Sequence, residues 1–329
     1  MTTRVFTGLK PTGRLQLGNY LGAIRPLLDH VTDPANETLV CVADLHALTV
    51  DHDPRRLRAL SLELATTLLA CGLDPRARLF LQSSVPAHTE LSYLLESTAT
   101  YGEMSRMVQF KEKSTGREST RLSLLTYPAL MAADVLAYRT DVVPVGDDQR
   151  QHLELTATLA RRFNARYGEV FTVPRGVLPA ESARVKDLRD PTAKMGKSGA
   201  DGSGVIYLLD DPDTVAAKVR RAVTDGDPAL SYDVDGRPGV ANLAVLLAAL
   251  TGRTPEQALL GLGGAAALKA AVTEAVVATL EPLQRRYREL AADPAELLRL
   301  LRRGAASVEG DARATVAAAR AAIGLLGVT

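Results

Sequence analysis

The stretch "DVVPVGDDQRQHLELTATLARRFNARYG" occupies residues 141–168 and joins two different structural patterns. Its first part, 141–146, is mostly apolar and predicts a short buried strand. The second part, 147–168, repeats apolar side chains at helical spacing and predicts a helix. The turn between them lies at the carboxyl end of a strand and opens a helix, which is where ligands bind in open α/β sheets.

The alternation of strand and helix patterns extends towards the N-terminus. Further strands are predicted at 4–9, 37–45 and 78–84, and further helices at 17–31, 54–72, 86–99 and in a stretch that ends at Tyr138. Strands that alternate with helices at this spacing indicate parallel βαβ units. Beyond about residue 210 the strand patterns stop and only helical periods continue. We therefore predict an α/β chain in which a parallel sheet is followed by a helical region.

Composition limits the class of protein. The 329 residues carry a formal net charge of +1, so no global positive field indicates nucleic acid, although a neutral total can contain a local basic face. Cys41 and Cys71 lie in apolar stretches without metal-ligand spacing, and we expect buried free thiols in a reducing cytoplasm. The sequence contains no long uncharged apolar run, so we expect neither a signal peptide nor a membrane span.

The segment "GLKPTGRLQLGNY" (8–20) follows a predicted strand and precedes a predicted helix. Its glycines, Gly8, Gly13 and Gly18, allow the backbone to approach a ligand closely. The first N–H groups of the helix, near Gly18 and Asn19, form a natural anion site. The segment matches neither the Walker A sequence nor the dinucleotide fingerprint, so a plain turn-rich loop is the alternative.

Three carboxylates are candidates for ligand contacts. Asp134 lies within an apolar predicted helix, and a buried carboxylate needs a donor. That donor is either Arg139 or Arg150, or the N–H of a ligand. Asp147 and Asp148 follow the predicted strand at 141–146 and either contact a ligand or serve as helix N-terminal charges.

The segment "AKMGKSGADGSG" (193–204) holds Lys194 and Lys197 among glycine and serine residues. Most segments of this composition are solvated loops. Two cations on one loop also suit closure over a polyphosphate, where they follow its charge as a bond breaks. The residues by themselves leave both interpretations open.

Together these segments resemble the tryptophanyl-tRNA synthetases, which are class I enzymes, over nearly the whole chain. "LQLGN" (15–19) is similar to the family's form of the HIGH signature, in which T-x-G-N is typical, and "KMGKS" (194–198) is similar to KMSKS. All class I enzymes share these two short signatures. The block of "LTYPALMAAD" (125–134) and "VPVGDDQRQHLELT" (143–156) is more specific and separates the chain from the tyrosyl enzymes. Further segments that fit the family are "GEMSRMVQFKEKS" (102–114) and "RFNARYGE" (162–169).

The resemblance implies a Rossmann-like catalytic domain at 1–205, which forms part of a homodimer interface, and an α-helical anticodon-binding domain at 206–329. It implies that ATP, with Mg²⁺, activates L-tryptophan to tryptophanyl-adenylate, and that the acyl group then passes to the 3′ end of tRNA(Trp). It implies a cytoplasmic enzyme without a structural zinc ion or iron–sulfur cluster.

The resemblance also assigns roles to residues. Asp134 is expected to accept the indole N–H, which would select for a ligand with that donor. The indole walls are assigned to Phe6, Met131, Val135, Val143 and Val145, with ordinary core packing as the alternative. The amino-acid end is assigned to Tyr127 and Gln149, with His46 nearby. The phosphates are assigned to Lys113, Lys194 and Lys197 as catalytic residues. Other nucleotide contacts are assigned to Lys10, Pro11, Thr12, Gly18, Asn19, Gly146, Asp147, Asp148, Val185, Met195, Gly196 and Ser198.

Three residues depart from the family pattern. Gln16 stands where Thr is usual, and its amide is able to donate to a phosphate. Lys10 stands where many members have Gln, and Gly196 replaces the first Ser of KMSKS. These departures lead to the hypothesis that the chain is an auxiliary copy resistant to tryptophan-mimicking antibiotics, with Lys10 as the first candidate determinant.

Two alternative functions stay open at this level. One is a relative that activates another amino acid, such as tyrosine. The other is a non-catalytic paralogue that binds tryptophan as a sensor, although the phosphate lysines argue against it.

The helical region is less informative. Its arginines either contact tRNA phosphates or form a solvated face, and Tyr287 either stacks on a base or packs on a helix. The arginines are Arg285, Arg286, Arg288, Arg302 and Arg303.

Overall fold

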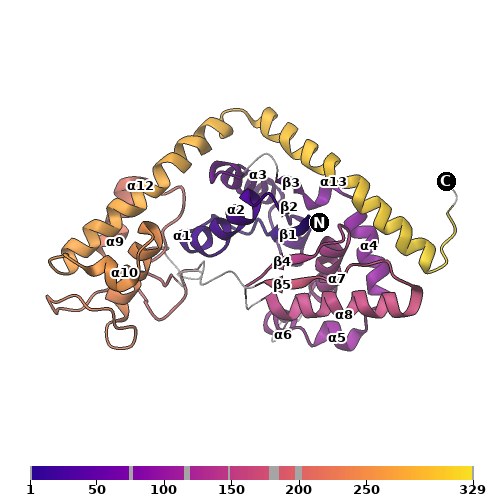
Figure 1. The fold of residues 1–329 in the computed structure, drawn as a ribbon, viewed down its shortest axis with the longest axis horizontal. Coiled ribbons are helices and arrows are strands. Elements are labelled where there is room, and N and C mark those ends of the chain that lie inside the picture. Colours follow the sequence, from indigo (N-terminus) through magenta and orange to yellow (C-terminus); the bar gives the residue numbers. More distant parts are fainter. Residues whose placement is uncertain are drawn as a thin grey trace.

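Parallel strands form one sheet in the order β3–β2–β1–β4–β5 in the computed structural model (Figure 1). The structure describes residues 2–73, 77–114, 119–146, 149–177, 185–196 and 202–327. The strands within these ranges are β1 (Thr3–Leu9), β2 (Asn36–Val42), β3 (Arg78–Leu81), β4 (Val142–Pro144) and β5 (Arg175–Val177). The order reverses between β1 and β4, which is the point where an open doubly wound sheet binds its ligands.

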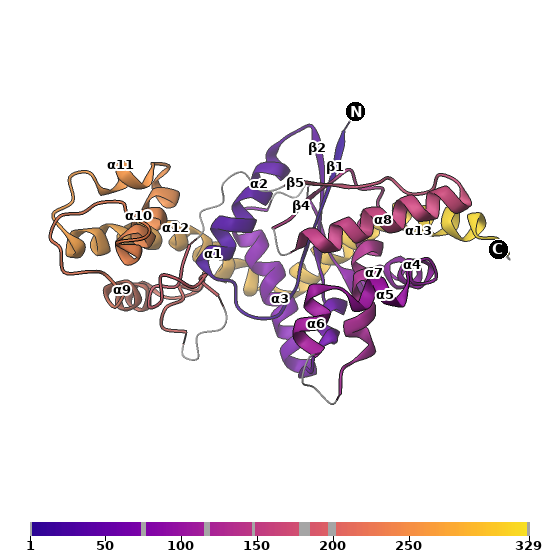
Figure 2. The ribbon, with the colours of Figure 1, turned by 90° about the horizontal axis from the view of Figure 1, so that it is seen from below.

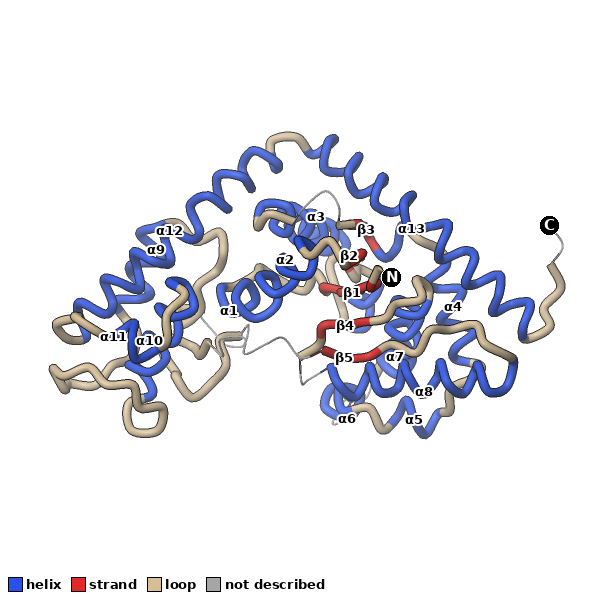
Figure 3. Tube along the Cα trace, in the orientation of Figure 1, coloured by secondary structure: helices blue, strands red, loops and turns tan. Residues whose placement is uncertain are grey.

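Helices connect the strands and cover both faces of the sheet (Figure 3). Those of the N-terminal half are α1 (Leu17–Asn19), η1 (Tyr20–Ile24), α2 (Arg25–Thr32), η2 (Leu45–Thr49), α3 (Pro54–Ala70), η3 (Gln82–Ser84), α4 (Ala87–Glu96), α5 (Tyr101–Ser105), α6 (Val108–Ser114), α7 (Leu122–Leu136) and α8 (Arg150–Tyr167). Those of the C-terminal part are α9 (Pro212–Arg220), α10 (Pro238–Thr251), α11 (Pro255–Leu259), α12 (Ala265–Ala291) and α13 (Pro294–Ala322).

The sheet carries a hydrophobic core on each face because successive side chains of a strand point in opposite directions. In β2, Val40 and Val42 belong to one core, and Leu39 and Cys41 belong to the other. The first core continues through α3 into the C-terminal helices α9, α10 and α12, and the second joins α4, α7, α8 and α13. A strand buried on both faces is continuously apolar, which explains the run "LVCV" in β2.

The C-terminal helices form two groups. Helices α9 and α10 pack with α12 in a lobe beside the sheet, whereas α13 packs against β3 and α4 (Figures 1 and 2). Together α12 and α13 form an arch that spans the molecule (Figure 1). The contact between α13 and β3 is close, because a Cβ added at Gly304 would lie 1.7 Å from the carbonyl oxygen of Leu79. The division of the chain at residue 205 into two domains stays a prediction.

The predicted α/β fold is confirmed, with three local differences. Strand β5 was not predicted, because its three residues "RGV", of which Arg175 and Gly176 are exposed, lack an apolar pattern. The segment 17–31, predicted as one helix, consists of α1, the π-helix η1 and α2, and Pro26 lies in the first turn of α2. Cys41 is buried as expected, but Cys71 is only partly buried, and both are free thiols.

Candidate active site

The loop after β1 leads into α1 and positions Gly18 and Asn19, which form one end of the candidate site. Gln16 caps α1: its side-chain oxygen accepts from the N–H of Gly18, and its own N–H donates to Oδ1 of Asn19 at 3.2 Å. This reciprocal capping fixes the backbone of Gly18 and Asn19 at the carboxyl end of β1. The amide nitrogen of Gln16 donates to the carbonyl of Met195 at 2.7 Å. This bond uses one hydrogen of the NH2 group, so the expected donation from Gln16 to a phosphate falls to the second hydrogen and stays a prediction.

Two of the predicted cations lie near Thr49. Nζ of Lys10 donates to Oγ1 of Thr49 at 3.1 Å. Lys113, whose Nζ donates to Oε1 of Gln109 at 3.1 Å, lines a cavity of about 260 Å³ together with Thr49 and Arg121. The structure thus brings Lys10 and Lys113 to the same region although 103 positions separate them in the sequence. Beside Lys10, Pro11 is buried and Thr12 is exposed.

Asp134 is buried in α7, with 4% of the residue exposed, and it accepts hydrogen bonds from several elements. Nε2 of Gln82, at the end of β3, lies 2.7 and 2.9 Å from its two carboxylate oxygens. Nε2 of His46, in η2, lies 2.8 Å from Oδ2, and Nδ1 of His88, in α4, lies 2.5 Å from Oδ1. These donors replace the expected Arg139 or Arg150 within the described part of the chain.

The environment of Asp134 keeps this carboxyl ionised. Burial opposes ionisation, but the charge of His88 and the hydrogen bonds from His46 and His88 outweigh it and lower the pKa of Asp134 to about 2. Nε2 of His88 in turn bonds the hydroxyl of Tyr138 at 2.6 Å. Because an ionised carboxylate only accepts hydrogen bonds, Nδ1 of His88 carries the proton that points at Asp134.

The described donors use the acceptor positions of Asp134. An ionised carboxylate offers about four such positions. Oδ1 lies within hydrogen-bond distance of Gln82 and His88, and Oδ2 lies within hydrogen-bond distance of Gln82 and His46. A further N–H would therefore bond Asp134 in place of one of the two contacts that Gln82 makes.

The residues assigned to the indole walls lie in the core around Asp134. Phe6, Val135, Val143 and Val145 are all buried in the core on the α7 side of the sheet, and the ring of Phe6 stacks on Tyr138 at 6.0 Å. Met131, one turn before Val135 on α7, is partly buried. This placement fits both a wall and ordinary core packing.

The residues assigned to the amino-acid end come from α7 and the start of α8. The hydroxyl of Tyr127 bonds Nε2 of His152, and burial raises the pKa of Tyr127. The ring of His46 meets that of Tyr127 edge-on at 6.2 Å, so Tyr127 lies beside the Asp134 cluster. Gln149 is the N-cap residue of α8, and its N–H donates to the carbonyl of Gly146 at 2.9 Å.

The segment with Lys194 and Met195 packs against the residues around Val185. The N–H of Met195 donates to the carbonyl of Val185 at 3.1 Å, and both side chains are buried. Lys194 pairs with Lys186 in an isolated antiparallel bridge and is exposed, and Gly196 is partly buried. The other nucleotide assignments, Asp147, Asp148, Lys197 and Ser198, lie outside the described residues.

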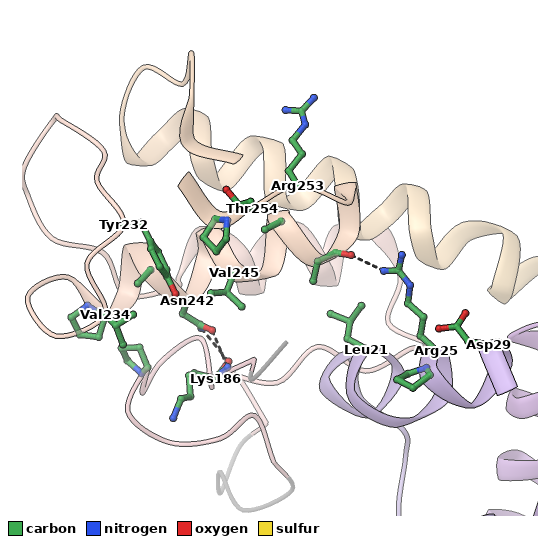
Figure 4. A pocket seen from close by; sticks show the side chains of 17 residues that line it. Leu21, Arg25, Asp29, Lys186, Tyr232, Val234, Asn242, Val245, Arg253 and Thr254 are labelled. Carbon is green, nitrogen blue, oxygen red and sulfur yellow. Dashed lines mark hydrogen bonds between the residues drawn. The ribbon is translucent and has the colours of Figure 1, made fainter. Parts of the chain in front are cut away.

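A larger cavity of about 820 Å³ lies elsewhere, between α2 and α10 (Figure 4). Arg25, Lys186 and Tyr232 are among its lining residues, and none of the described site residues named above lines it. We place the site at the strand ends rather than in this groove, because the buried ionised carboxylate and the two cations lie there.

None of the helices in the described ranges of the chain combines the length and the apolar run that a membrane crossing requires. The same ranges contain no group of three or more His, Cys, Asp or Glu side chains arranged to hold a metal ion.

Sequence analysis missed Gln82, His88 and Thr49. Gln82 directly follows β3 and His88 lies in the next helix, so the rule that ligand contacts gather at strand carboxyl ends would have selected Gln82. Thr49 and His88 carry no such signal, because their roles depend on contacts with Lys10 and Asp134, which are distant in sequence.

A doubly wound parallel sheet with a helix N-terminus, two cations and a buried acceptor at its switch point defines a nucleotide-binding enzyme of the Rossmann-like class. Residues 1–281 match the family of class I tRNA synthetases for tryptophan and tyrosine (W and Y). The chain belongs to this family.

The relatives point to the tryptophan branch of the family. The chain is 54% identical to tryptophan–tRNA ligase 1 of Streptomyces avermitilis, over 98% of this chain and 99% of that protein. The crystal structure of the tryptophanyl-tRNA synthetase from Mycoplasma pneumoniae superposes with a TM-score of 0.86 at 38% identity, over 99% of each chain. The enzyme from Campylobacter jejuni in complex with ADP and tryptophan gives a TM-score of 0.85 at 30% identity, over 98% of this chain and 100% of that chain.

Proposed function

We propose that this protein activates L-tryptophan with ATP and transfers the activated amino acid to the 3′ end of tRNA(Trp). The carboxylate of tryptophan attacks the α-phosphorus of ATP, which forms tryptophanyl-adenylate and releases pyrophosphate. A ribose hydroxyl of the tRNA terminus then attacks the acyl carbon and releases AMP. The relatives of high identity over nearly the full chain support this function, and the tyrosine-activating and non-catalytic alternatives are not favoured.

The observation that carries the specificity proposal is the buried, ionised Asp134. Its carboxylate accepts from Gln82, His46 and His88, and Gln82 contacts both of its oxygens. The indole N–H of tryptophan would take the place of one of the two Gln82 contacts, inside a wall of apolar side chains. A ligand without the donor gains no such bond, and a site built for a hydrogen bond discriminates strongly on this ground.

Adenylate formation needs no general base, because the attacking carboxylate is already ionised. The rate then depends on positioning and on neutralising the charge that develops on the leaving pyrophosphate. Lys113 and Lys194 are proposed for this role, with Lys197 from the signature segment. Mg²⁺ enters as part of the Mg–ATP substrate and supplies further charge neutralisation on the phosphates.

The proposed partners follow from the same function. We propose a cytoplasmic homodimer that contacts the tRNA anticodon through the C-terminal helices, where Arg285, Arg286, Arg288, Arg302 and Arg303 are candidate phosphate contacts. The exposure of Arg286 and Arg302 supports this role, since both side chains are accessible to a ligand.

The test is pyrophosphate exchange dependent on the amino acid. Tryptophan is expected to support rapid exchange of labelled pyrophosphate into ATP, and tyrosine is expected to support none above background. Exchange with tyrosine alone would favour the tyrosine-activating alternative. Binding of tryptophan without any exchange would favour the non-catalytic alternative.

A further inference from the structure

Gln16 joins two segments that are 179 residues apart in sequence. Only 3% of the residue is exposed, and both ends of its side-chain amide are bonded. The oxygen accepts from the N–H of Gly18 and caps α1, while the nitrogen donates to the carbonyl of Met195 at 2.7 Å. One side chain thus fixes the start of α1 and the backbone of the Lys194–Gly196 segment at the same time.

The surrounding backbone is organised about this contact. On one side, the N–H of Leu17 donates to the carbonyl of Ile206 at 2.8 Å, and Gln16 forms an antiparallel bridge with Tyr207. On the other side, the N–H of Met195 donates to the carbonyl of Val185 at 3.1 Å. Within the described residues, the side chain of Gln16 donates to the carbonyl of Met195, and Met195 is 1% exposed. Loss of this donor would leave a buried acceptor without its partner, which proteins rarely tolerate.

The side chain of Gln16 has two roles, the cap on α1 and the bond to the Met195 carbonyl, and a substitution can remove one without the other. A threonine, which the family usually has here, can cap a helix through its hydroxyl. Its side chain ends one bond beyond Cβ, whereas the amide nitrogen of glutamine lies two bonds further out. A threonine at position 16 would therefore retain the cap on α1 and lose the bond to the Met195 carbonyl.

We propose that Gln16 is a positioning residue that holds the Lys194–Gly196 segment at a fixed distance from the α1 N-terminus. This inference rests on the proposed function, in which Gly18, Asn19 and Lys194 contact ATP. A segment fixed before ATP arrives loses less conformational freedom on binding, so the contact favours ATP and leaves tryptophan unaffected. Asp134, which is proposed to select tryptophan, lies in a separate cluster on α7.

The first experiment compares the wild type with Gln16→Thr in tryptophan-dependent exchange. The kcat/KM for ATP is expected to fall roughly five- to tenfold, the effect of one lost hydrogen bond to a buried acceptor, while the KM for tryptophan stays unchanged. Gln257→Thr is the matched control, because Gln257 is also part of a helix cap but lies on α11. An unchanged kcat/KM for ATP in Gln16→Thr, or an equal loss for both substrates, would overturn the proposal.

The second experiment needs no catalysis. Limited trypsin digestion of the ligand-free protein is expected to cleave after Lys194 about fivefold faster in Gln16→Thr than in the wild type or in Gln257→Thr, because the segment opens more often. Equal cleavage rates in all three proteins would also overturn the proposal. If the wild type fails to exchange with tryptophan, the proposed function fails, while the digestion still decides whether Gln16 holds the segment.

Discussion

At the scale of single residues, Asp134 is an ionised carboxylate whose burial is stabilised by neighbouring hydrogen-bond donors. An ionised carboxylate buried without partners would destabilise the fold by several kcal/mol. Hydrogen bonds from Gln82, His46 and His88 offset that cost, and His88 and His46 lower the pKa of Asp134 to about 2 against the effect of burial. Because the pKa of Asp134 is lower in the folded protein than in the unfolded chain, the ionised carboxylate stabilises the fold at pH values above the ordinary Asp pKa of 3.8. This contribution to the free energy of unfolding is lost as the pH falls towards 2.

The first prediction concerns Asp134→Asn. The Kd for tryptophan is expected to rise about 10- to 100-fold, because a hydrogen bond to a charged acceptor is replaced by an amide that can present its own N–H. Calorimetric titration measures this with tryptophan and with its benzothienyl analogue, which lacks the N–H. The wild type should prefer tryptophan and the variant should not.

Asp141→Asn is the matched control for that prediction. Asp141 precedes β4 and its carboxylate accepts from the N–H of Arg4 at 2.9 Å, so the same substitution there changes the sheet but not the Asp134 cluster. Retention of the preference for tryptophan in Asp134→Asn would remove Asp134 from the indole site.

The second prediction concerns Lys10. Lys10 donates to Thr49 close to Lys113, in the region proposed for the phosphates and the amino-acid carboxylate. Lys10→Gln restores the residue that many family members carry, and we expect the variant to become about tenfold more sensitive to an indole antibiotic in the exchange assay. Lys111→Gln, on the same helix as Lys113, serves as the control. Equal sensitivity of wild type and Lys10→Gln would exclude Lys10 as the determinant.

At the scale of elements, α13 is held to the sheet by shape and by charge. Gly304 allows the helix backbone to approach β3, where a Cβ would overlap the carbonyl of Leu79. Arg78, at the start of β3, pairs with Asp311 of α13 at 3.6 Å, and Arg4 of β1 pairs with the same carboxylate at 3.2 Å. These contacts hold α13 against the sheet, although its first turns also pack with α12.

The third prediction uses two glycines of α13. Gly304→Ala is expected to lower the free energy of unfolding by about 1–3 kcal/mol, because the added methyl group forces the helix away from β3. Gly310→Ala is the control on the same helix: its Cβ would meet no atom within 4 Å, so better helix propensity should raise stability by up to about 1 kcal/mol. Denaturant titration measures both. Equal effects of the two substitutions would contradict the close packing of α13 on β3.

At the scale of the whole molecule, large apolar side chains are exposed at the starts of α5, α6 and α7 within the described residues. Tyr101, Val108 and Leu122 are 75%, 50% and 72% exposed. Exposed apolar surface marks protein–protein interfaces where it is contiguous. We propose that these residues contribute to a homodimer interface on the sheet-bearing part of the chain.

The fourth prediction is the oligomeric state. The wild type is expected to sediment with twice the chain mass of 35.1 kDa, and the double variant Tyr101→Asp with Leu122→Asp is expected to sediment as a single chain. Leu260→Asp is the control, because this residue is 75% exposed on the C-terminal lobe. A wild type of single-chain mass would contradict the homodimer, and a dimeric double variant would move the interface elsewhere.

The sequence by itself determined the order and type of the elements. Strand β2 and helix α3 can be predicted from the sequence because apolar periodicity is a local property of a few consecutive residues. The signature segments at 15–19 and 194–198 likewise identify the family from short runs of residues. Strand β5 was not predicted because three residues, two of them exposed, are too few to show such a period.

Only the tertiary structure decided which side chains meet. The donors to Asp134 come from η2, η3 and α4, and the partner of the Gln16 amide is the Met195 carbonyl. These pairings depend on strand order and on the register of helices against the sheet, which bring distant residues within hydrogen-bond range. Local sequence patterns do not predict distances between residues that are far apart in the chain. The hydrogen bonds that Asp134 accepts, and the contact of Gln16 with a second segment, therefore follow only from the folded structure.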